Sequence, residues 1–281
     1  EFSNETFIES ALRLAEEKVT EDDLSEIESK LSRIIFYKEE GKASISNSDY
    51  SCYLTTLHNA KTLKEALING TATFLPDEKG KLNSEAIYNL NTGYITDGVN
   101  LLMLQHQKKT MGYSSNVVGT MNTIQAAKTV IKRGEKGVGY NFLVDNEYRH
   151  GSFLFPEQTE HPERLQNYRN KKLKDNKKLT DQNLIVEKAE EYLPSYFAAA
   201  KGGMSVTVKP EATEEFKKRF IEILDNTLSK KRNPEIPVLS EFCFSADKAA
   251  NQIIKDKKQE INKLAVVESS PIKNKKKGIQ Y

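Results

Sequence analysis

Apolar residues recur at helical spacing in several segments of the chain, and each of these segments predicts an amphipathic helix. The first two segments, 3–18 and 21–40, predict an antiparallel helical pair. A capping-box pattern at Thr62-Leu63-Lys64-Glu65 predicts a short helix that ends near Gly70. Further helices are expected over residues 98–109, 123–132, 181–200, 211–228 and 245–264.

The pattern changes to the two-residue period of β-strands in two places. Apolar and polar residues alternate over 138–144, a turn-like Asp-Asn-Glu follows at 145–147, and aromatic residues resume up to Phe155. This arrangement predicts a β-hairpin. A short strand is also expected at 204–208. Together the elements predict a helix-rich α+β protein with a small β-hairpin or sheet in its central domain.

Charge divides the chain into regions. The formal net charge is only +2, but acidic residues outnumber basic ones over 1–88, and basic residues outnumber acidic ones in the remainder. We therefore predict an acidic helical region at 1–88, a core domain at 89–160, and a basic, mainly helical region at 161–281 that ends in a disordered basic tail. A polyanion is expected to bind the later, basic part.

The expected compartment is the cytoplasm. No run of residues approaches the roughly 20 apolar positions needed to cross a bilayer, and the N-terminus lacks the pattern of a secretory signal. Cys52 and Cys243 lie far apart, which suits neither a disulfide framework nor a zinc cluster. We expect no membrane partner.

No arrangement of side chains predicts catalysis. The four histidines are scattered, and none belongs to a His-Glu-x-x-His motif, so we expect no metal site and no cofactor. The loop at 133–137 lacks the spacing of a P-loop and follows a predicted helix instead of a strand. Catalytic residues are therefore not expected, and we expect that the chain is not an enzyme.

Three short motifs follow one another in the central region. They are an Asn-Thr-Gly-Tyr turn at 91–94, a Gly-Tyr-Ser element at 112–114, and a Lys-Arg-Gly-Glu-Lys-Gly loop at 132–137. Their order and spacing resemble the N-terminal, single-stranded-DNA-binding domain of ArdC-type antirestriction proteins, a family that includes polyvalent proteins of plasmids and phages. Relatives commonly place a Trp after the Gly-Tyr-Ser element, where this chain has Val117 and Val118.

The resemblance and the residue chemistry together indicate a DNA-binding surface. Cationic side chains and backbone N–H groups between glycines suit phosphate oxygens, and tyrosine rings suit unpaired bases. The alternative is that the glycines only make a tight turn and the tyrosines fill the core. The expected DNA-binding residues are Lys132, Arg133, Gly134, Lys136, Gly137, Tyr94, Tyr113, Tyr140 and Arg149.

Asn100 stands at the start of a predicted helix, directly after the turn at 91–97. A side-chain amide at such a position commonly forms hydrogen bonds to the backbone of the adjoining turn. We therefore expect Asn100 to hold this turn in place instead of touching DNA.

The expected function is single-stranded-DNA binding with little sequence preference, which protects the DNA of a mobile genetic element such as a plasmid or phage. The alternative is a protein-interaction module whose acidic region, 1–88, binds a restriction enzyme or another DNA-binding protein, for example a conjugation protein. Proteins that resemble ArdC usually carry a zinc metalloprotease-like domain that we do not recognise here, so an enzymatic activity would require a domain beyond Tyr281. The sequence does not predict the oligomeric state.

Overall fold

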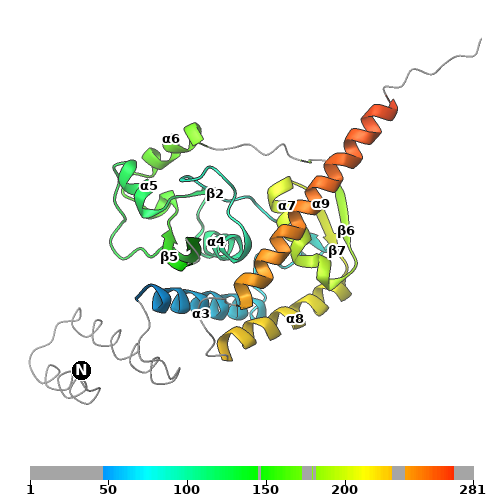
Figure 1. Ribbon diagram of the computed structural model, residues 1–281, viewed down its shortest axis with the longest axis horizontal. Helices are drawn as coiled ribbons and strands as arrows, with labels where there is room; N and C mark the ends of the chain where they lie inside the picture. Colours follow the sequence, from blue (N-terminus) through cyan, green and yellow to red (C-terminus); the bar gives the residue numbers. More distant parts are fainter. Residues whose placement is uncertain (1–46, 145–146, 173–178, 180–181, 230–237, 269–281) are drawn as a thin grey trace, which may run out of the picture.

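The structure is a computed structural model that describes residues 47–144, 147–172, 179, 182–229 and 238–268 of the 281-residue chain (Figure 1). The helical pair predicted before residue 41 and the basic tail near the C-terminus lie outside these residues. Within the described residues, no helix combines the length and the apolar character that a membrane crossing requires.

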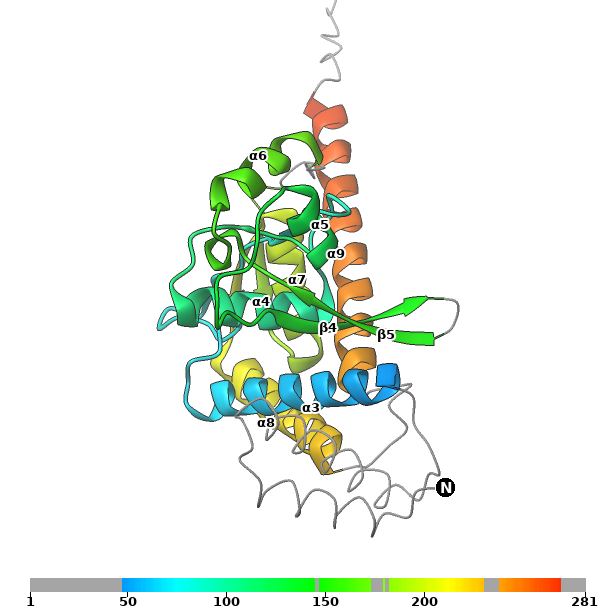
Figure 2. The ribbon, with the colours of Figure 1, turned by 90° about the vertical axis from the view of Figure 1, so that its left-hand side faces the viewer.

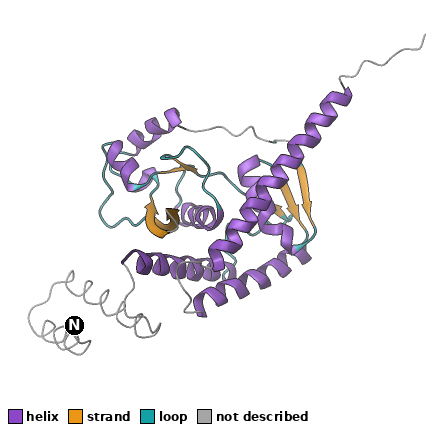
Figure 3. Ribbon diagram, in the orientation of Figure 1, coloured by secondary structure: helices purple, strands orange, loops and turns teal. Residues whose placement is uncertain are grey.

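Helices dominate the described chain, with short strands between them (Figure 3). The helices are α3 (Asn47–Ile68), α4 (Gly98–Met111), α5 (Met121–Ala126), α6 (Pro162–Lys172), α7 (Tyr192–Gly202), α8 (Pro210–Ser229) and α9 (Val238–Glu268), with 3-10 turns η1 (Pro156–Gln158) and η2 (Ala189–Glu191). The strands are β1 (Lys81–Leu82), β2 (Tyr88–Asn89), β3 (Val117–Val118), β4 (Val138–Val144), β5 (Glu147–Phe153), β6 (Asn183–Val186) and β7 (Ser205–Val208). The predicted helix-rich α+β class is confirmed.

The strands form small separate sheets. A three-stranded sheet has the order β1-β7-β6, in which β7 pairs antiparallel with β1 and parallel with β6. β2 and β3 form a short parallel pair, and β4 and β5 form the predicted antiparallel hairpin. The hairpin runs alongside α3, and its outer end projects from the body of the molecule (Figure 2).

The main hydrophobic core contains residues from all three predicted regions. It extends along the chain from Ala60 to Ala250, and α7 is buried over most of its length. Phe74 contacts Tyr196, Phe216 and Phe220 edge to face, with ring centroids 5.7–6.3 Å apart. A smaller cluster around Leu90 and Leu165 covers the other side of the central region. The boundaries predicted at 88/89 and 160/161 therefore do not separate independent cores.

The helix predicted over 181–200 is wrong in its first half. Residues 183–186 form β6, because β7 supplies a parallel partner strand. Burial alternates along β6 with the two-residue period of a strand: Ile185 is exposed and Val186 is buried. The helix α7 begins only at Tyr192. Pro194 lies in its first turn, where the helix needs no backbone N–H and the ring is tolerated.

Other helix ends also differ from the prediction. α3 and α9 begin earlier than predicted, because residues such as Cys52 and Leu239 extend their buried faces toward the N-terminus. α5 lies over 121–126, and Lys128 just beyond it has a left-handed φ of 55° that a continuing helix does not allow. α4 agrees with the prediction, since Gly112 closes it with a φ of 67°.

Candidate nucleic-acid interface

One face of the β4–β5 hairpin carries aromatic residues. Residues directly opposite each other in an antiparallel pair point to the same side, and the register places Tyr140 opposite Gly151 and Phe142 opposite Arg149. The Tyr140 ring stacks on Phe153 at 3.9 Å between centroids, and a side chain at Gly151 would collide with it. Phe142 and Arg149 are exposed at the outer part of this face.

The opposite face of the hairpin is fixed to α3. The Asn141 side chain donates from Nδ2 to the Cys52 carbonyl oxygen at 2.9 Å and to Thr56 Oγ1 at 3.1 Å. His150 Nδ1 lies 2.8 Å from Thr55 Oγ1. These contacts hold the hairpin in one orientation, so its aromatic face has a defined position relative to the body of the protein.

The loop at 132–137 enters this hairpin at its base. A Cβ atom at Gly137 would lie 2.6 Å from the Phe153 carbonyl oxygen, so only glycine allows the two chains to come this close. Gly134 has a φ of +84° and is exposed, with open space around it. The glycines of the motif therefore make a tight backbone turn, as one of the two sequence-based interpretations expected.

The charged side chains of this loop point in different directions. Lys132, Arg133 and Lys136 are exposed to solvent, and Lys132 Nζ donates to the Glu157 carbonyl oxygen at 2.9 Å. Glu135 instead accepts hydrogen bonds from Gln158 Nε2 at 3.0 Å and from the Tyr113 hydroxyl at 3.3 Å. The loop thus keeps its carboxylate inside and presents its cations outside.

The Gly-Tyr-Ser element connects the end of α4 to this loop. Tyr113 packs on Phe155 with 5.2 Å between ring centroids, and partial burial, followed by the nearby Glu135 carboxylate, raises the pKa of its hydroxyl. The hydroxyl therefore stays protonated and donates to Glu135. Tyr113 is a half-buried support of the loop, with only part of its ring available to a ligand.

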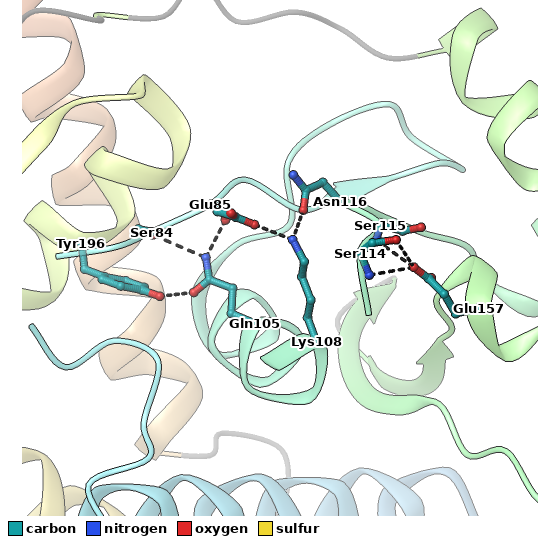
Figure 4. Close-up of polar contacts among 9 residues, drawn as sticks. All are labelled: Ser84, Glu85, Gln105, Lys108, Ser114, Ser115, Asn116, Glu157 and Tyr196. Atoms are coloured by element: carbon teal, nitrogen blue, oxygen red, sulfur yellow. Dashed lines mark hydrogen bonds and ion pairs between the residues drawn. The ribbon is translucent and has the colours of Figure 1, made fainter. Parts of the chain in front are cut away.

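Glu157 in η1 holds the segment that follows Tyr113 (Figure 4). Its Oε1 accepts from the backbone N–H groups of Ser114 and Ser115 at 2.9 and 2.8 Å, and from the Ser114 hydroxyl at 3.1 Å. Partial burial raises the pKa of this carboxyl group, but the hydrogen bonds outweigh burial and lower it overall. A charged Glu157 thus fixes the turn between α4 and β3.

A second polar network occupies the inner side of α4 (Figure 4). Buried Gln105 accepts a hydrogen bond from the Tyr196 hydroxyl and donates to the Glu85 carbonyl oxygen at 2.5 Å. Lys108 pairs with the Glu85 carboxylate and also donates to Asn116 Oδ1. The charge of Lys108 is therefore neutralised within the protein and is not available to a polyanion.

The structure brings most of the predicted site residues into one region. The loop residues lie at the base of the hairpin, Tyr113 supports the loop, and Tyr140 lies on the hairpin. Arg149 lies four residue pairs from the base of the hairpin, which corresponds to about 13 Å at the usual rise per residue of a β-strand. Tyr94 is 56% exposed and lies in a different turn, directly after β2.

A cavity of about 420 Å³ beside the hairpin was not predicted from the sequence. It lies between α3, the first turn of α4, β4 and the first turns of α9, and Phe142 and Asn100 are among its lining residues. Asn100 Oδ1 is buried with no hydrogen-bond partner in the described structure, so the prediction that this side chain holds the preceding turn is wrong. No sequence signal indicates a cavity whose walls come from five elements, α3, α4, β4, β5 and α9.

The described residues contain no group of three or more His, Cys, Asp or Glu side chains suited to holding a metal ion. Cys52 and Cys243 are both buried and form no disulfide, and burial raises the pKa of the Cys243 thiol.

Comparison with known proteins identifies the class of this domain. Residues 59–189 match the model of a family described as the N-terminal domain of anti-restriction factor ArdC. This match confirms the resemblance to ArdC-type proteins that the three motifs indicate. The match begins within α3 and ends at η2, so it extends beyond residues 89–160 on both sides.

Two solved structures of the antirestriction ArdC protein from plasmid R388 are similar to this chain. One is metal-free and the other is Mn(II)-bound, with TM-scores of 0.47 and 0.48 and 12% sequence identity in both cases. Each comparison covers 72% of this chain and 97% of the ArdC chain. No curated protein matches the chain.

Proposed function

We propose that this protein binds single-stranded DNA, with little sequence preference, on the surface formed by the 132–137 loop and the aromatic face of the β4–β5 hairpin. The observation that carries the proposal is the exposure of Lys132, Arg133 and Lys136 at the base of a hairpin whose outer face carries Phe142 and Arg149. Cations suit the phosphates of a strand, and exposed rings suit its unpaired bases.

We further propose an antirestriction-type role in the cytoplasm of a cell that carries plasmid or phage DNA. The support is the match of residues 59–189 to a domain of a factor that is named for anti-restriction. In this role the domain binds single strands of mobile-element DNA, and it needs no catalytic group of its own.

The test is a binding titration with a labelled oligo-dT strand, followed by fluorescence anisotropy at several salt concentrations. We expect affinity for the single strand that falls steeply as salt rises, because cation–phosphate contacts release counterions. A blunt duplex of equal length is the matched control and should compete poorly, since its bases are not available for stacking. Equal binding of the duplex would contradict the proposal.

The acidic region at 1–88 supports an alternative proposal, a surface for a restriction enzyme or another DNA-binding protein. Residues 1–46 of this region lie outside the described residues. The same titration separates the two proposals, because the protein-binding alternative requires no affinity for oligo-dT.

A further inference from the structure

The cations of the loop and hairpin differ from many other charged side chains of the described surface. Elsewhere, lysines and arginines pair with carboxylates from separate parts of the chain: Lys64–Asp225, Lys108–Glu85, Lys201–Asp247, Lys209–Glu187 and Arg219–Glu190. Lys132, Arg133, Lys136 and Arg149 form no ion pair with another residue whose side chain the structure describes. All four are exposed, so their charge is open to a polyanion.

The chain itself contains a polyanionic segment. Residues 1–46, which lie outside the described residues, hold twelve Asp and Glu residues but only six Lys and Arg residues. Their sequence predicts amphipathic helices over 3–18 and 21–40, and the second of these has three acidic residues in its predicted first turn. Such a segment combines carboxylates on its polar face with an apolar stripe, and both need a surface that complements them.

This segment joins the described body beside the outer part of the hairpin. The Cys52 carbonyl oxygen, near the start of α3, accepts from Asn141, whereas Asn59 farther along α3 donates to the Gly139 carbonyl oxygen at 3.5 Å. The helix α3 therefore runs from the outer part of the hairpin toward its base (Figure 2). Residues 41–46 span about 20 Å when extended, so the predicted helix at 21–40 lies within reach of the hairpin and the loop.

The surface next to this junction also offers apolar contacts. Phe142 on β4 is 37% exposed, and Leu54 in the first half of α3 is 46% exposed. Phe142 shares its face of the hairpin with Arg149, so apolar and cationic groups alternate over a short distance. An occupant that combines an apolar stripe with carboxylates matches this surface in both respects.

We propose that residues 1–46 bind the cationic surface of the loop and hairpin in the DNA-free protein, and that a bound single strand displaces them. The inference rests on the proposed function, because it names the regulation of the same surface. Tethering gives the segment an effective concentration in the millimolar range, so weak contacts suffice to hold it there. A strand binds only molecules whose surface is open, which lowers its apparent affinity.

The acidic segment of a second copy of the chain would offer the same charges to this surface. The junction beside Phe142 and Arg149 favours the segment of the same molecule instead. A second copy would have to reach millimolar concentration to compete with a segment tethered at this distance. The two cases differ in one measurable respect, since only binding between copies depends on protein concentration.

The first experiment measures oligo-dT affinity of the full chain at low salt by fluorescence anisotropy. The test variant removes four negative charges from the segment: Glu16→Gln, Glu17→Gln, Glu21→Gln and Asp22→Asn. It should bind at least about five-fold more tightly than the wild type, because more molecules have an open surface. The control makes the same change in net charge on α8, which lies on the side of α3 away from the hairpin (Figure 2): Glu211→Gln, Glu214→Gln, Glu215→Gln and Glu222→Gln. It should bind as the wild type does, since salt screens charges at that distance.

The second experiment follows the segment directly by hydrogen exchange and mass spectrometry. Amides of residues 21–40 should exchange faster when saturating oligo-dT is added. Without DNA, the variant Lys132→Ala, Arg133→Ala, Lys136→Ala should show the same acceleration, because it lacks the cations that hold the segment. The control Lys218→Ala, Lys255→Ala, Lys263→Ala removes three exposed cations of α8 and α9 and should leave this exchange unchanged.

The possible failures are distinct. Equal oligo-dT affinity of the wild type and the segment variant overturns the inference and leaves the proposed function intact. No binding of oligo-dT by either protein overturns both. Exchange of residues 21–40 that is the same in the wild type and the loop variant overturns docking on the loop. Exchange that slows as protein concentration rises would assign the contact to a second copy and overturn docking within one molecule.

Discussion

The three tyrosines of the predicted site lie in different environments. Tyr94 is exposed, Tyr113 packs on Phe155 and donates to Glu135, and Tyr140 stacks on Phe153. The sequence alone treats them as equivalent flat faces. The structure distinguishes one exposed ring from two rings that pack on neighbouring phenylalanines.

This distinction leads to opposite expectations for two substitutions. Tyr94→Ala should weaken binding of oligo-dT by roughly 1–3 kcal/mol, the contribution of a base stacked on its exposed ring. Tyr113→Ala should lower the free energy of unfolding by about 2 kcal/mol, less than a fully buried ring, because it loses the Phe155 contact and the Glu135 hydrogen bond. Anisotropy and thermal unfolding measured on both variants check the pair. If Tyr94→Ala instead lowered the free energy of unfolding and Tyr113→Ala only weakened oligo-dT binding, the exposed Tyr94 ring would be the structural one.

At the scale of the element, local sequence predicts some features and not others. α4, the β4–β5 hairpin and the tight loop between glycines follow from turn residues and periodicity that lie within each segment. The strand β6 does not, because its partner β7 lies about twenty residues later in the chain. The cavity also depends on distant elements, since α3, α4, β4 and α9 each contribute part of its wall. The sequence could therefore predict the exposed cations of the 132–137 loop, but it could not predict the asparagines that line the cavity.

The 3-10 turn η1 supplies an element-scale prediction through Glu157. The lowered pKa of its carboxyl group means that the folded state binds the proton less tightly than the unfolded state does. The charged Glu157 carboxylate therefore stabilises the fold fully above pH 4.5, the ordinary pKa of a glutamate. This stabilisation is lost as the pH falls through the lower pKa that the group has in the folded state. Glu157→Gln should destabilise the protein by about 1 kcal/mol at pH 7 and by less near pH 3.

Thermal unfolding of this variant and of the wild type across pH measures the difference. Glu160→Gln, which neutralises an exposed carboxylate three residues later, is the control and should show no such pH dependence. A difference between Glu157→Gln and the wild type that stays constant from pH 7 to pH 3 would contradict the assigned role of the charge.

At the scale of the whole molecule, the described elements share one main core. β1, at residues 81–82, pairs with β7 at 205–208, and Phe74 packs against rings of α7 and α8. The three motifs of the central region therefore rest on segments that come before and after them in the chain. The hairpin keeps its position because α3 supports it from below, as Figure 2 shows.

This arrangement predicts one cooperative unfolding transition for the described body. Far-ultraviolet and near-ultraviolet circular dichroism should report the same melting temperature, because helices and tyrosine packing are lost together. The isolated segment 89–160 should lack a cooperative transition, since it loses Phe74, Tyr196 and the other core partners outside it. Two separated transitions in the full chain would show that the regions fold independently.

The salt dependence of single-strand binding tests the central claim most directly. Each phosphate contact on a single strand contributes about 0.7 to the slope of log affinity against log salt, so replacing Lys132, Arg133 and Lys136 together with Ala should reduce the slope by up to ~2. Oligo-dT affinity should fall at low salt, with the melting temperature unchanged because all three side chains are exposed. An unaltered slope would contradict the account, since the loop would then be only a turn, and the basic segment at 171–178 would become the better candidate for the DNA contact.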